Sequence, residues 1–187
     1  MLALEILVSW FAADFLTGLF HWWQDKYMDE PQWAWANELA KENERHHTKP
    51  TAMVLSSGWT NMQSAAVVGW PLAAILWALG LPTMVWLTIF FATFGNLVHR
   101  WSHIPRRRLP IWIRFLQSTG LFISQLEHDL HHRSMRKLIP RHEAGYKFCA
   151  MSNWVNPILD STGFWSLLEA AFSVAGFQTT SQRKASN

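Results

Sequence analysis

Three apolar stretches alternate with polar segments along the chain of 187 residues. Residues 2–21 are long enough to cross a bilayer as one helix, although two acidic residues interrupt them. Residues 64–98 carry no charged side chain and are divided by Gly-Leu-Pro at 80–82, which predicts two antiparallel helices joined by a tight turn. Residues 111–126 are apolar but too short to span comfortably at about 1.5 Å per residue. The pattern therefore predicts a membrane hairpin beside an N-terminal span.

Counting membrane crossings turns these lengths into a topology. If the first stretch crosses once and the hairpin twice, the polar segments around His46 and His99 lie on the same side. A fourth crossing would move the later histidines to the opposite face, so we expect residues 111–126 to be interfacial or re-entrant. Residues 32–47 are expected to form a short interfacial helix, and residues 164–177 a further apolar helix that lies along the interface or packs on the others. The predicted fold is an all-α integral membrane bundle of about three to four membrane-embedded helices plus interfacial helices, with a histidine cluster on one membrane face.

The composition and length support one membrane domain. Half of the residues are hydrophobic, 13 are Trp and 12 are Phe, and only 16% are charged, a balance typical of chains that contact lipid. An unusually aromatic soluble core is the alternative. The length suits a single domain, expected over residues 1–177, and the polar residues 178–187 are expected to form a disordered tail. The net charge of +3 is spread over short basic patches, which argues against nucleic acid as a partner. Cys149 is the single cysteine, which excludes an internal disulfide and a thiolate metal cluster.

The placement of the histidines is the strongest chemical signal. All of them lie at or just beyond an apolar segment, on the side of the membrane predicted above. Residues four apart share one face of a helix, so His99 with His103, and His128 with its neighbours in HxxHH, can present two imidazoles to one ion. The candidate metal ligands are His21, His46, His47, His99, His103, His128, His131, His132 and His142.

Several polar residues near these histidines are candidates for a supporting role. Asp25 follows His21 by four residues, where its carboxylate could accept the free imidazole N–H, and a carboxylate inside a span such as Asp14 needs a partner. Asn96 lies three residues before His99 and could ligate a metal or hold a metal-bound water. The candidates for this second set are Asp14, Asp25, Asn96, Glu127 and Asp129.

The number of ligands limits the kind of metal site. One zinc ion takes four protein ligands, or three and a water, and would leave most of these histidines unexplained. Two metals with four or five ligands each would use nearly all of them, but imidazole suits iron, zinc, copper and nickel alike. Bis-histidine haem is a further alternative that needs far fewer ligands.

Five short stretches resemble the histidine-rich lipid desaturases, a family that includes enzymes acting on plasmanylethanolamine and on phosphatidylglycerol of plant plastids. "ADFLTGLFHWWQD" is similar to the family's opening Asp, Gly, His-Trp and Asp. "HHTKP", "HRWSH" and "HDLHH" resemble its HHxxP, HxxxH and HxxHH. "HEAGYKFCAMSNWVNPILDSTGFW" is similar to its ending, with His, Tyr-x-x-Cys, Trp-x-Asn and Leu-Asp. HxxHH by itself is common to many membrane desaturases and hydroxylases, whereas the order and spacing of all five motifs are specific.

The resemblance implies a non-haem di-iron centre, two iron ions per chain, held by the nine histidines. It also implies a reaction in which O2 and two electrons introduce a C=C bond into a membrane phospholipid, and a metal site on the cytosolic face. No electron-carrier motif is present, so an external donor, cytochrome b5-like or ferredoxin-like, is expected. The leading expectation is the vinyl ether of plasmalogens, formed from an alkyl ether phospholipid.

Three alternatives stay open on the sequence. Within the same chemistry, the substrate could be an ester-linked fatty acyl chain, which is desaturated or hydroxylated. In another class, the protein could be a non-catalytic membrane protein that binds metal or haem. A membrane hydrolase with catalytic zinc is the third, although no nucleophile elbow or zinc-protease motif supports it.

Overall fold

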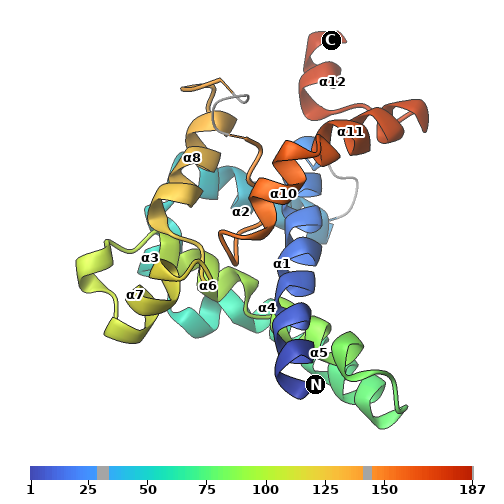
Figure 1. The fold of residues 1–187 in the computed structure, drawn as a ribbon. Coiled ribbons are helices and arrows are strands. Elements are labelled where there is room, and N and C mark those ends of the chain that lie inside the picture. Colours follow the sequence, from blue (N-terminus) through green and yellow to red (C-terminus); the bar gives the residue numbers. More distant parts are fainter. Residues whose placement is uncertain (29–33, 141–144, 187) are drawn as a thin grey trace.

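The computed structural model describes residues 1–28, 34–140 and 145–186, and the regular elements in these ranges are all helices (Figure 1). The predicted all-α class is therefore confirmed. In chain order the elements are α1 (Leu2–Tyr27), α2 (Ala34–Thr48), α3 (Thr51–Leu55), α4 (Gly58–Ala78), α5 (Thr83–Ala92), α6 (Gly95–Ser102), a 3₁₀ turn (Arg106–Arg108), α7 (Ile111–Ser118), α8 (Gln125–Met135), α10 (Val155–Ser161), α11 (Phe164–Val174) and α12 (Thr180–Ser186).

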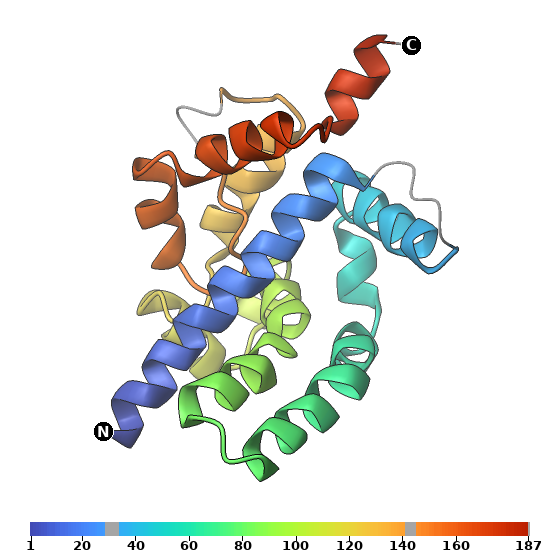
Figure 2. The ribbon, with the colours of Figure 1, turned by 90° about the vertical axis from the view of Figure 1, so that its right-hand side faces the viewer.

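Helix α1 is the central helix of the molecule, and other helices pack around it. The hairpin of α4 and α5 lies beside its N-terminal half, while α2, α8 and α11 gather around its C-terminal half (Figures 1 and 2). Trp10 meets Phe91 of α5 edge to face with 5.7 Å between ring centroids. At the other end, Trp22 meets Phe172 of α11 at 5.0 Å. One long helix thus links an apolar end of the molecule to the end where the histidines lie.

The predicted turn of the hairpin is present, but its return arm is broken. Gly80 adopts the left-handed conformation with φ of 74°, which a residue without a Cβ takes up at little cost. After Pro82, α5 is only 10 residues long and ends at Ala92, and α6 starts separately at Gly95. The apolar stretch 64–98 therefore ends in two short helices rather than one spanning arm.

One helix in the described ranges, α1, is long and apolar enough to cross a membrane. Its 26 residues extend about 39 Å at 1.5 Å per residue, more than the hydrocarbon core of a bilayer. The predicted set of three to four membrane-embedded helices is thus not found as long spans. On the α5 side, the physical reason is the break in the helix at residues 93–94, which leaves α5 too short to span.

The other predicted segments form shorter elements. Residues 111–126 give α7 and then a bend, where the Asn153 N–H donates to the Gly120 carbonyl at 2.9 Å, so this segment folds back instead of crossing. The predicted interfacial segments appear as α2 and α11. In the tail for which disorder is predicted, the structure places α12, and Arg183 donates to the Tyr27 carbonyl at 3.1 Å.

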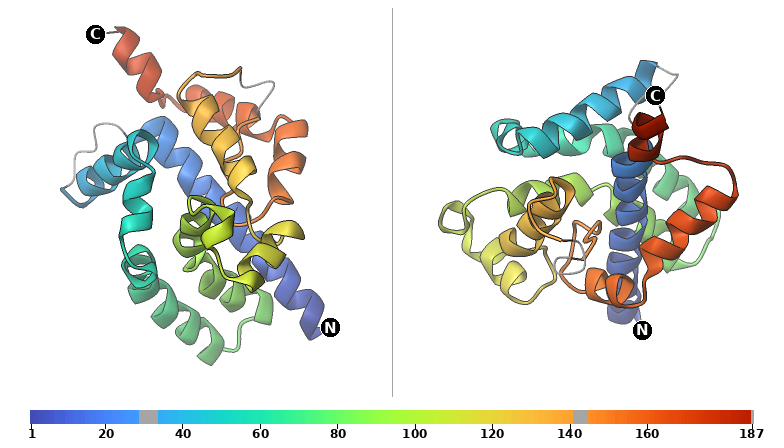
Figure 3. Two further views of the ribbon diagram at one scale, coloured as in Figure 1. Left: turned by 90° about the vertical axis from the view of Figure 1, so that its left-hand side faces the viewer. Right: turned by 90° about the horizontal axis from the view of Figure 1, so that it is seen from above.

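An extended segment between α8 and α10 passes through the core. We call residues 145–152 the strap; it runs back beside α1 (Figure 3). Met151 is buried with Ala13, Val98 and Ile123 in one apolar cluster. Phe148 and Cys149 are buried with aromatic residues of α1 and α11 in a second cluster. The strap therefore joins both halves of the core and holds its backbone next to α1.

Candidate metal centre

The structure brings eight of the nine candidate histidines together at the C-terminal end of α1. The ninth, His142, lies outside the described residues. The eight come from α1, α2, α6 and α8 and from the residue that follows α6. They divide into two groups whose possible ligand atoms lie within 4.8 Å of one another in each group.

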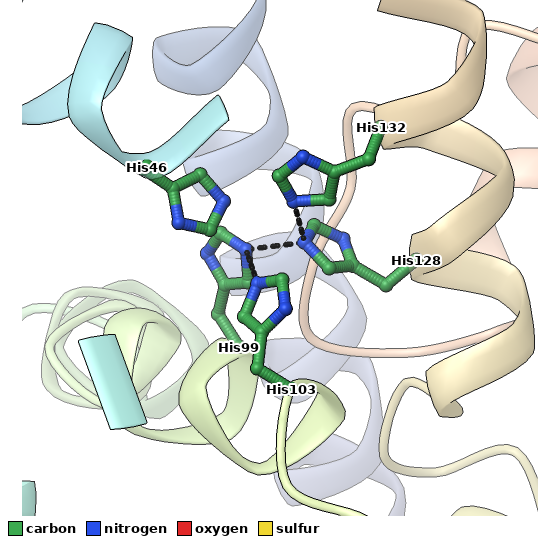
Figure 4. A group of neighbouring side chains, drawn as sticks. All are labelled: His46, His99, His103, His128 and His132. Atoms are coloured by element: carbon green, nitrogen blue, oxygen red, sulfur yellow. Dashed lines mark hydrogen bonds between the residues drawn. The ribbon is translucent and has the colours of Figure 1, made fainter. Parts of the chain in front are cut away.

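The first group consists of imidazoles only, and we call it the five-histidine group. Three nitrogen pairs are in close contact: His99 Nε2 lies 2.6 Å from His128 Nε2, which lies 2.9 Å from His132 Nε2. His103 Nε2 lies 3.4 Å from His99 Nε2, and the ring of His46 closes the group from α2 (Figure 4). The members are His46, His99, His103, His128 and His132. Imidazole nitrogens of several helices therefore point toward one place.

These spacings suit donors that surround one ion. Two nitrogens that each lie about 2.1 Å from a metal at a right angle are about 3.0 Å apart. The separations of 2.6, 2.9 and 3.4 Å bracket this value. A neutral imidazole has one N–H to donate, so a set of converging nitrogens leaves several lone pairs facing one another. A cation at their centre relieves that repulsion.

The second group contains three imidazoles and one carboxylate, and we call it the histidine–carboxylate group. Asp25 is its centre: Oδ1 lies 2.8 Å from His47 Nε2, and Oδ2 lies 3.3 Å from His131 Nε2 and 3.5 Å from His21 Nε2. Asn43 of α2 donates to Asp25 Oδ1 at 2.8 Å. The members are His21, Asp25, His47 and His131. A carboxylate with three imidazoles is a donor set that divalent transition metals accept.

Two strap carbonyls fix the tautomers in this group. His21 Nδ1 donates to the Phe148 carbonyl and His131 Nδ1 to the Tyr146 carbonyl, each at 2.9 Å. A neutral imidazole that donates from Nδ1 keeps its lone pair on Nε2. Both lone pairs then face Asp25, as they do when a histidine that binds a metal is oriented by a backbone carbonyl.

Burial keeps the five-histidine group neutral. Burial, followed by repulsion from neighbouring protonated histidines, lowers the pKa of His103 from 6.5 to about 4. The same two causes hold the pKa of His99 and His128 well below the ordinary value. His46 and His132 shift in the same direction. Neutral imidazoles are the form that binds a metal.

Buried polar atoms without a hydrogen-bond partner test whether a metal fits. In the described ranges, such atoms of the histidine–carboxylate group include His21 Nε2, His131 Nε2 and Asp25 Oδ2. In the five-histidine group, both ring nitrogens of His46 lack a hydrogen-bond partner. Each unsatisfied buried polar atom costs about 1–3 kcal/mol. Metal ions would satisfy these atoms together, so the residues present fit a site for two metal ions.

Helical geometry explains how adjacent histidines serve different groups. His128 and His132 are four residues apart on α8 and share one face, whereas His131 lies on the neighbouring face toward α1. His46 and His47 are consecutive on α2 and point about 100° apart. The pairs HH and HxxHH each contribute to both groups, and α2 and α8 hold the groups side by side.

The predicted supporting residues take different places. Asp25 lies among the donor atoms rather than behind His21, whose Nδ1 is already used by the Phe148 carbonyl. Asp14 is fully buried and accepts from the Met151 and Ser152 backbone and from the Ser152 hydroxyl, so its bonds go to the strap. The remaining three are not members of either group: Asn96 is exposed, Glu127 pairs with Lys147 at 2.6 Å, and the exposed Asp129 lines the cavity next to His128 and His132.

The carbonyls of Tyr146 and Phe148 are contacts that the sequence did not indicate. Every residue has a carbonyl, so no residue type signals this role. A cavity of about 190 Å³ opens against His103, His128 and His132 and is lined also by polar residues of α3, α6 and α8. It leads from the surface to the five-histidine group.

An all-helical fold with two adjoining groups of buried and half-buried imidazoles defines a histidine-rich protein whose donor atoms could hold metal ions. Residues 10–182 match the family model described as the lipid desaturase domain, so the chain belongs to the lipid desaturase family. This match confirms the family that the five motifs indicated.

The relatives in this family are distant but cover most of the chain. Plasmanylethanolamine desaturase 1 of Mus musculus is 27% identical over 182 residues, which are 90% of this chain and 64% of the relative. A probable fatty acid desaturase of Acanthamoeba polyphaga mimivirus is 25% identical, with 89% and 80% covered. The chloroplastic fatty acid desaturase 4 of Arabidopsis thaliana is 26% identical, with 91% and 51% covered. The chain thus spans between about half and four fifths of the length of these relatives. No solved structure matches the fold significantly.

Proposed function

We propose that the protein is an integral membrane lipid desaturase that uses two iron ions, O2 and two electrons. The five-histidine group and the histidine–carboxylate group would each hold one iron. Iron bound there would supply the oxidising chemistry by which O2, two electrons and two protons remove two hydrogen atoms from adjacent carbons and leave an alkene and two waters.

One observation carries this proposal: the possible ligand atoms of two adjoining groups lie within 4.8 Å of one another in each group, and buried atoms in both groups have no hydrogen-bond partner. A single structural zinc would use four of these residues and leave the others buried without a ligand. The family membership then selects desaturation among the reactions that such a centre can perform.

The chain's own residues prepare the site in three ways. The Tyr146 and Phe148 carbonyls hold His131 and His21 with their Nε2 lone pairs directed at Asp25. The Asp25 carboxylate places a negative charge between the imidazoles, which favours a cation there. Burial keeps the five-histidine group in the neutral form that binds metal.

The proposed substrate is an alkyl ether phospholipid, and the product is the vinyl ether of plasmalogens. The name of the mouse relative, a plasmanylethanolamine desaturase, supports this choice. The polar cavity at His103 also favours it, because a bond next to the glycerol backbone brings the headgroup close to the metals. The alternative is an ester-linked fatty acyl chain, which the names of the viral and plant relatives favour.

The proposed location is the membrane, with the metal centre on the cytosolic face. Apolar side chains are exposed along the N-terminal half of α1 and along α4, as in Leu2, Leu4, Ile6, Val8, Val67, Val68, Ile75 and Trp77. Exposed apolar side chains that gather on neighbouring helices favour contact with lipid or protein. The two metal groups lie at the other end of α1, as a site at the membrane surface requires. Electrons would come from an external donor, cytochrome b5-like or ferredoxin-like.

Metal analysis of the purified chain with a visible spectrum is the first test. We expect about two irons per chain, as one ion for each group predicts, and no haem band. A haem spectrum or a single zinc would contradict the proposal. His131→Ala and His132→Ala should lower bound iron and abolish activity, whereas Arg107→Ala in the 3₁₀ turn should leave both unchanged.

Lipid analysis of cells that express the protein and receive an alkyl ether lipid decides the substrate. An acid-labile product two hydrogens lighter identifies a vinyl ether, since acid releases an aldehyde from it. An acid-stable double bond in an ester-linked chain supports the alternative substrate, and an added oxygen identifies hydroxylation. Two irons with an unchanged lipid pool despite an added electron donor would indicate a non-catalytic metal-binding protein.

A further inference from the structure

Side chains make most of the hydrogen bonds that satisfy the backbone of the strap, and the Ile123 N–H donates to the Met151 carbonyl at 2.8 Å. At its C-terminal end, Asp14 accepts from the Met151 and Ser152 N–H groups at 2.8 and 3.0 Å. In its middle, Asn156 accepts from the Cys149 N–H at 3.0 Å and donates to the Cys149 carbonyl at 2.7 Å. Buried backbone groups need such partners. These contacts hold the strap in one register against α1.

At the N-terminal end of the strap, the partner is Asp160. Its Oδ1 accepts from the Tyr146 N–H at 3.1 Å and from the Lys147 N–H at 3.5 Å. Asp160 and Asn156 are four residues apart on α10, so one face of this helix holds both parts of the strap. Neither residue touches a member of the two metal groups through these bonds.

The backbone at this end is held in an unusual conformation. Gly145 has a φ of 70° and Lys147 a φ of 49°, a region that residues with a side chain rarely adopt. A Cβ added to Gly145 would overlap the carboxylate of Asp160. The Lys147 side chain is held in turn by Glu127 of α8 at 2.6 Å. Strained backbone of this kind persists where its surroundings determine it.

This conformation directs the carbonyls that reach the metal ligands. Tyr146 and Phe148, on either side of Lys147, bond to His131 and His21 with their carbonyls. In the described part of the chain, the hydrogen bonds from the strap to histidines go to these two residues, both in the histidine–carboxylate group. A change at Asp160 should therefore act on this group and not on the five-histidine group.

We propose that Asp160 is a positioning residue for the histidine–carboxylate group, acting through the backbone of Tyr146 and Lys147 and the carbonyls that orient His131 and His21. This inference rests on the proposed function, because it takes the group to be a metal site. Outer partners that orient metal-binding histidines contribute about 10–100-fold to metal affinity. Asp160 would contribute to metal affinity through the strap backbone rather than through a direct bond to a histidine.

The test uses the full-length chain in detergent, stripped of metal and titrated with Co²⁺ in competition with a chelator. Asp160→Ala should weaken one of two bound Co²⁺ ions by about 10-fold or more and leave the other unchanged. The visible Co²⁺ bands that it loses should be those that His131→Ala loses. Asp160→Asn keeps an oxygen that can accept from the Tyr146 N–H and should retain most of the affinity. Ser161→Ala is the matched control, because Ser161 is an exposed neighbour on α10 whose hydroxyl donates to the Ile158 carbonyl of the same helix.

Gly145→Ala tests the same contact from the other side, since its Cβ displaces the Asp160 carboxylate without deleting it. It should weaken the binding of the same Co²⁺ ion as Asp160→Ala does. If Asp160→Ala does not fold, Gly145→Ala alone tests the positioning role. Equal loss at both metal groups in these variants, or unchanged affinity at both, would overturn the positioning role. Wild-type protein that binds no Co²⁺ would instead contradict the proposed metal centre, so the two failures are distinguishable.

Discussion

Replacement of His46 and of His47, one at a time, should remove different metal ions. The two residues are consecutive on α2, but His47 lies 2.8 Å from Asp25 in the histidine–carboxylate group, whereas His46 packs against His99, His103 and His132. His47→Ala should release the ion of the histidine–carboxylate group. His46→Ala should weaken the ion of the five-histidine group.

The size of each effect follows from the number of donors that remain. Metal sites of four protein ligands bind with about 10–16 kcal/mol, or about 2.5–4 kcal/mol per ligand. This corresponds to about 10²–10³-fold in the dissociation constant. His47→Ala leaves three donors and should reach the full effect. His46→Ala leaves four imidazoles, so its effect should lie at the lower end.

The assay is metal content per chain after dialysis against increasing chelator, measured on protein purified in detergent. Wild-type protein should release metal in two steps, and each variant should lack a different step. Arg45→Ala is the matched control, because Arg45 precedes both residues on α2 and its exposed side chain pairs with Glu42 at 3.2 Å rather than with a histidine. Loss of the same step in both variants, or of both steps in each, would refute the division into two groups.

Three further predictions concern other parts of the site. Asp25→Asn removes the one carboxylate of the histidine–carboxylate group and should lower its metal affinity at least as far as His47→Ala; an unchanged chelator titration would contradict a ligand role. Gly18→Ala places a Cβ 2.5 Å from Cys149 Sγ and should cost about 1–3 kcal/mol through overpacking, seen as a lower thermal midpoint; an unchanged midpoint would show that the strap can move away. Acidification should destabilise the metal-free chain, because the pKa of His103 is about 4 in the folded chain and 6.5 in the unfolded chain. The unfolded chain therefore binds more protons below pH 6.5. Each such histidine lowers the free energy of unfolding by up to about 1.4 kcal/mol per pH unit. A thermal midpoint that stays constant between pH 7.5 and 5 would contradict this sign.

The sequence predicts local features, such as helices and pairs of histidines on one helix, better than the division of the histidines into two groups. The turn at Gly80 and the i, i+4 pair of His99 and His103 follow from local rules, because glycine permits a positive φ and a helix repeats every 3.6 residues. The assignment of His131 to a different group from His128 depends on which neighbouring helix each face meets. That information is tertiary and has no local pattern.

The predicted roles of the acidic residues show the same limit. The spacing of His21 and Asp25 predicts a carboxylate behind the imidazole, yet the imidazole N–H bonds to the Phe148 carbonyl, 127 residues further along the chain. Asp25 is thereby free to face the donors. For Asp14 the sequence predicts a partner near the histidines, whereas the structure pairs its carboxylate with the strap backbone. A charge in an apolar helix indicates that a partner exists without identifying it.

One face of α1 relates these residues to one another. Asp14, Gly18, His21 and Asp25 follow the spacing i, i+4, i+7 and i+11, which places them along a single helical stripe. The strap runs antiparallel along this stripe: Asp14 holds Ser152 and Met151, Gly18 leaves room for Cys149, and His21 meets the Phe148 carbonyl. Asp25, beyond the end of these contacts, reaches the other histidines. The same stripe therefore anchors the strap and carries two members of the histidine–carboxylate group, so the helix that bears His21 also holds the backbone that orients it.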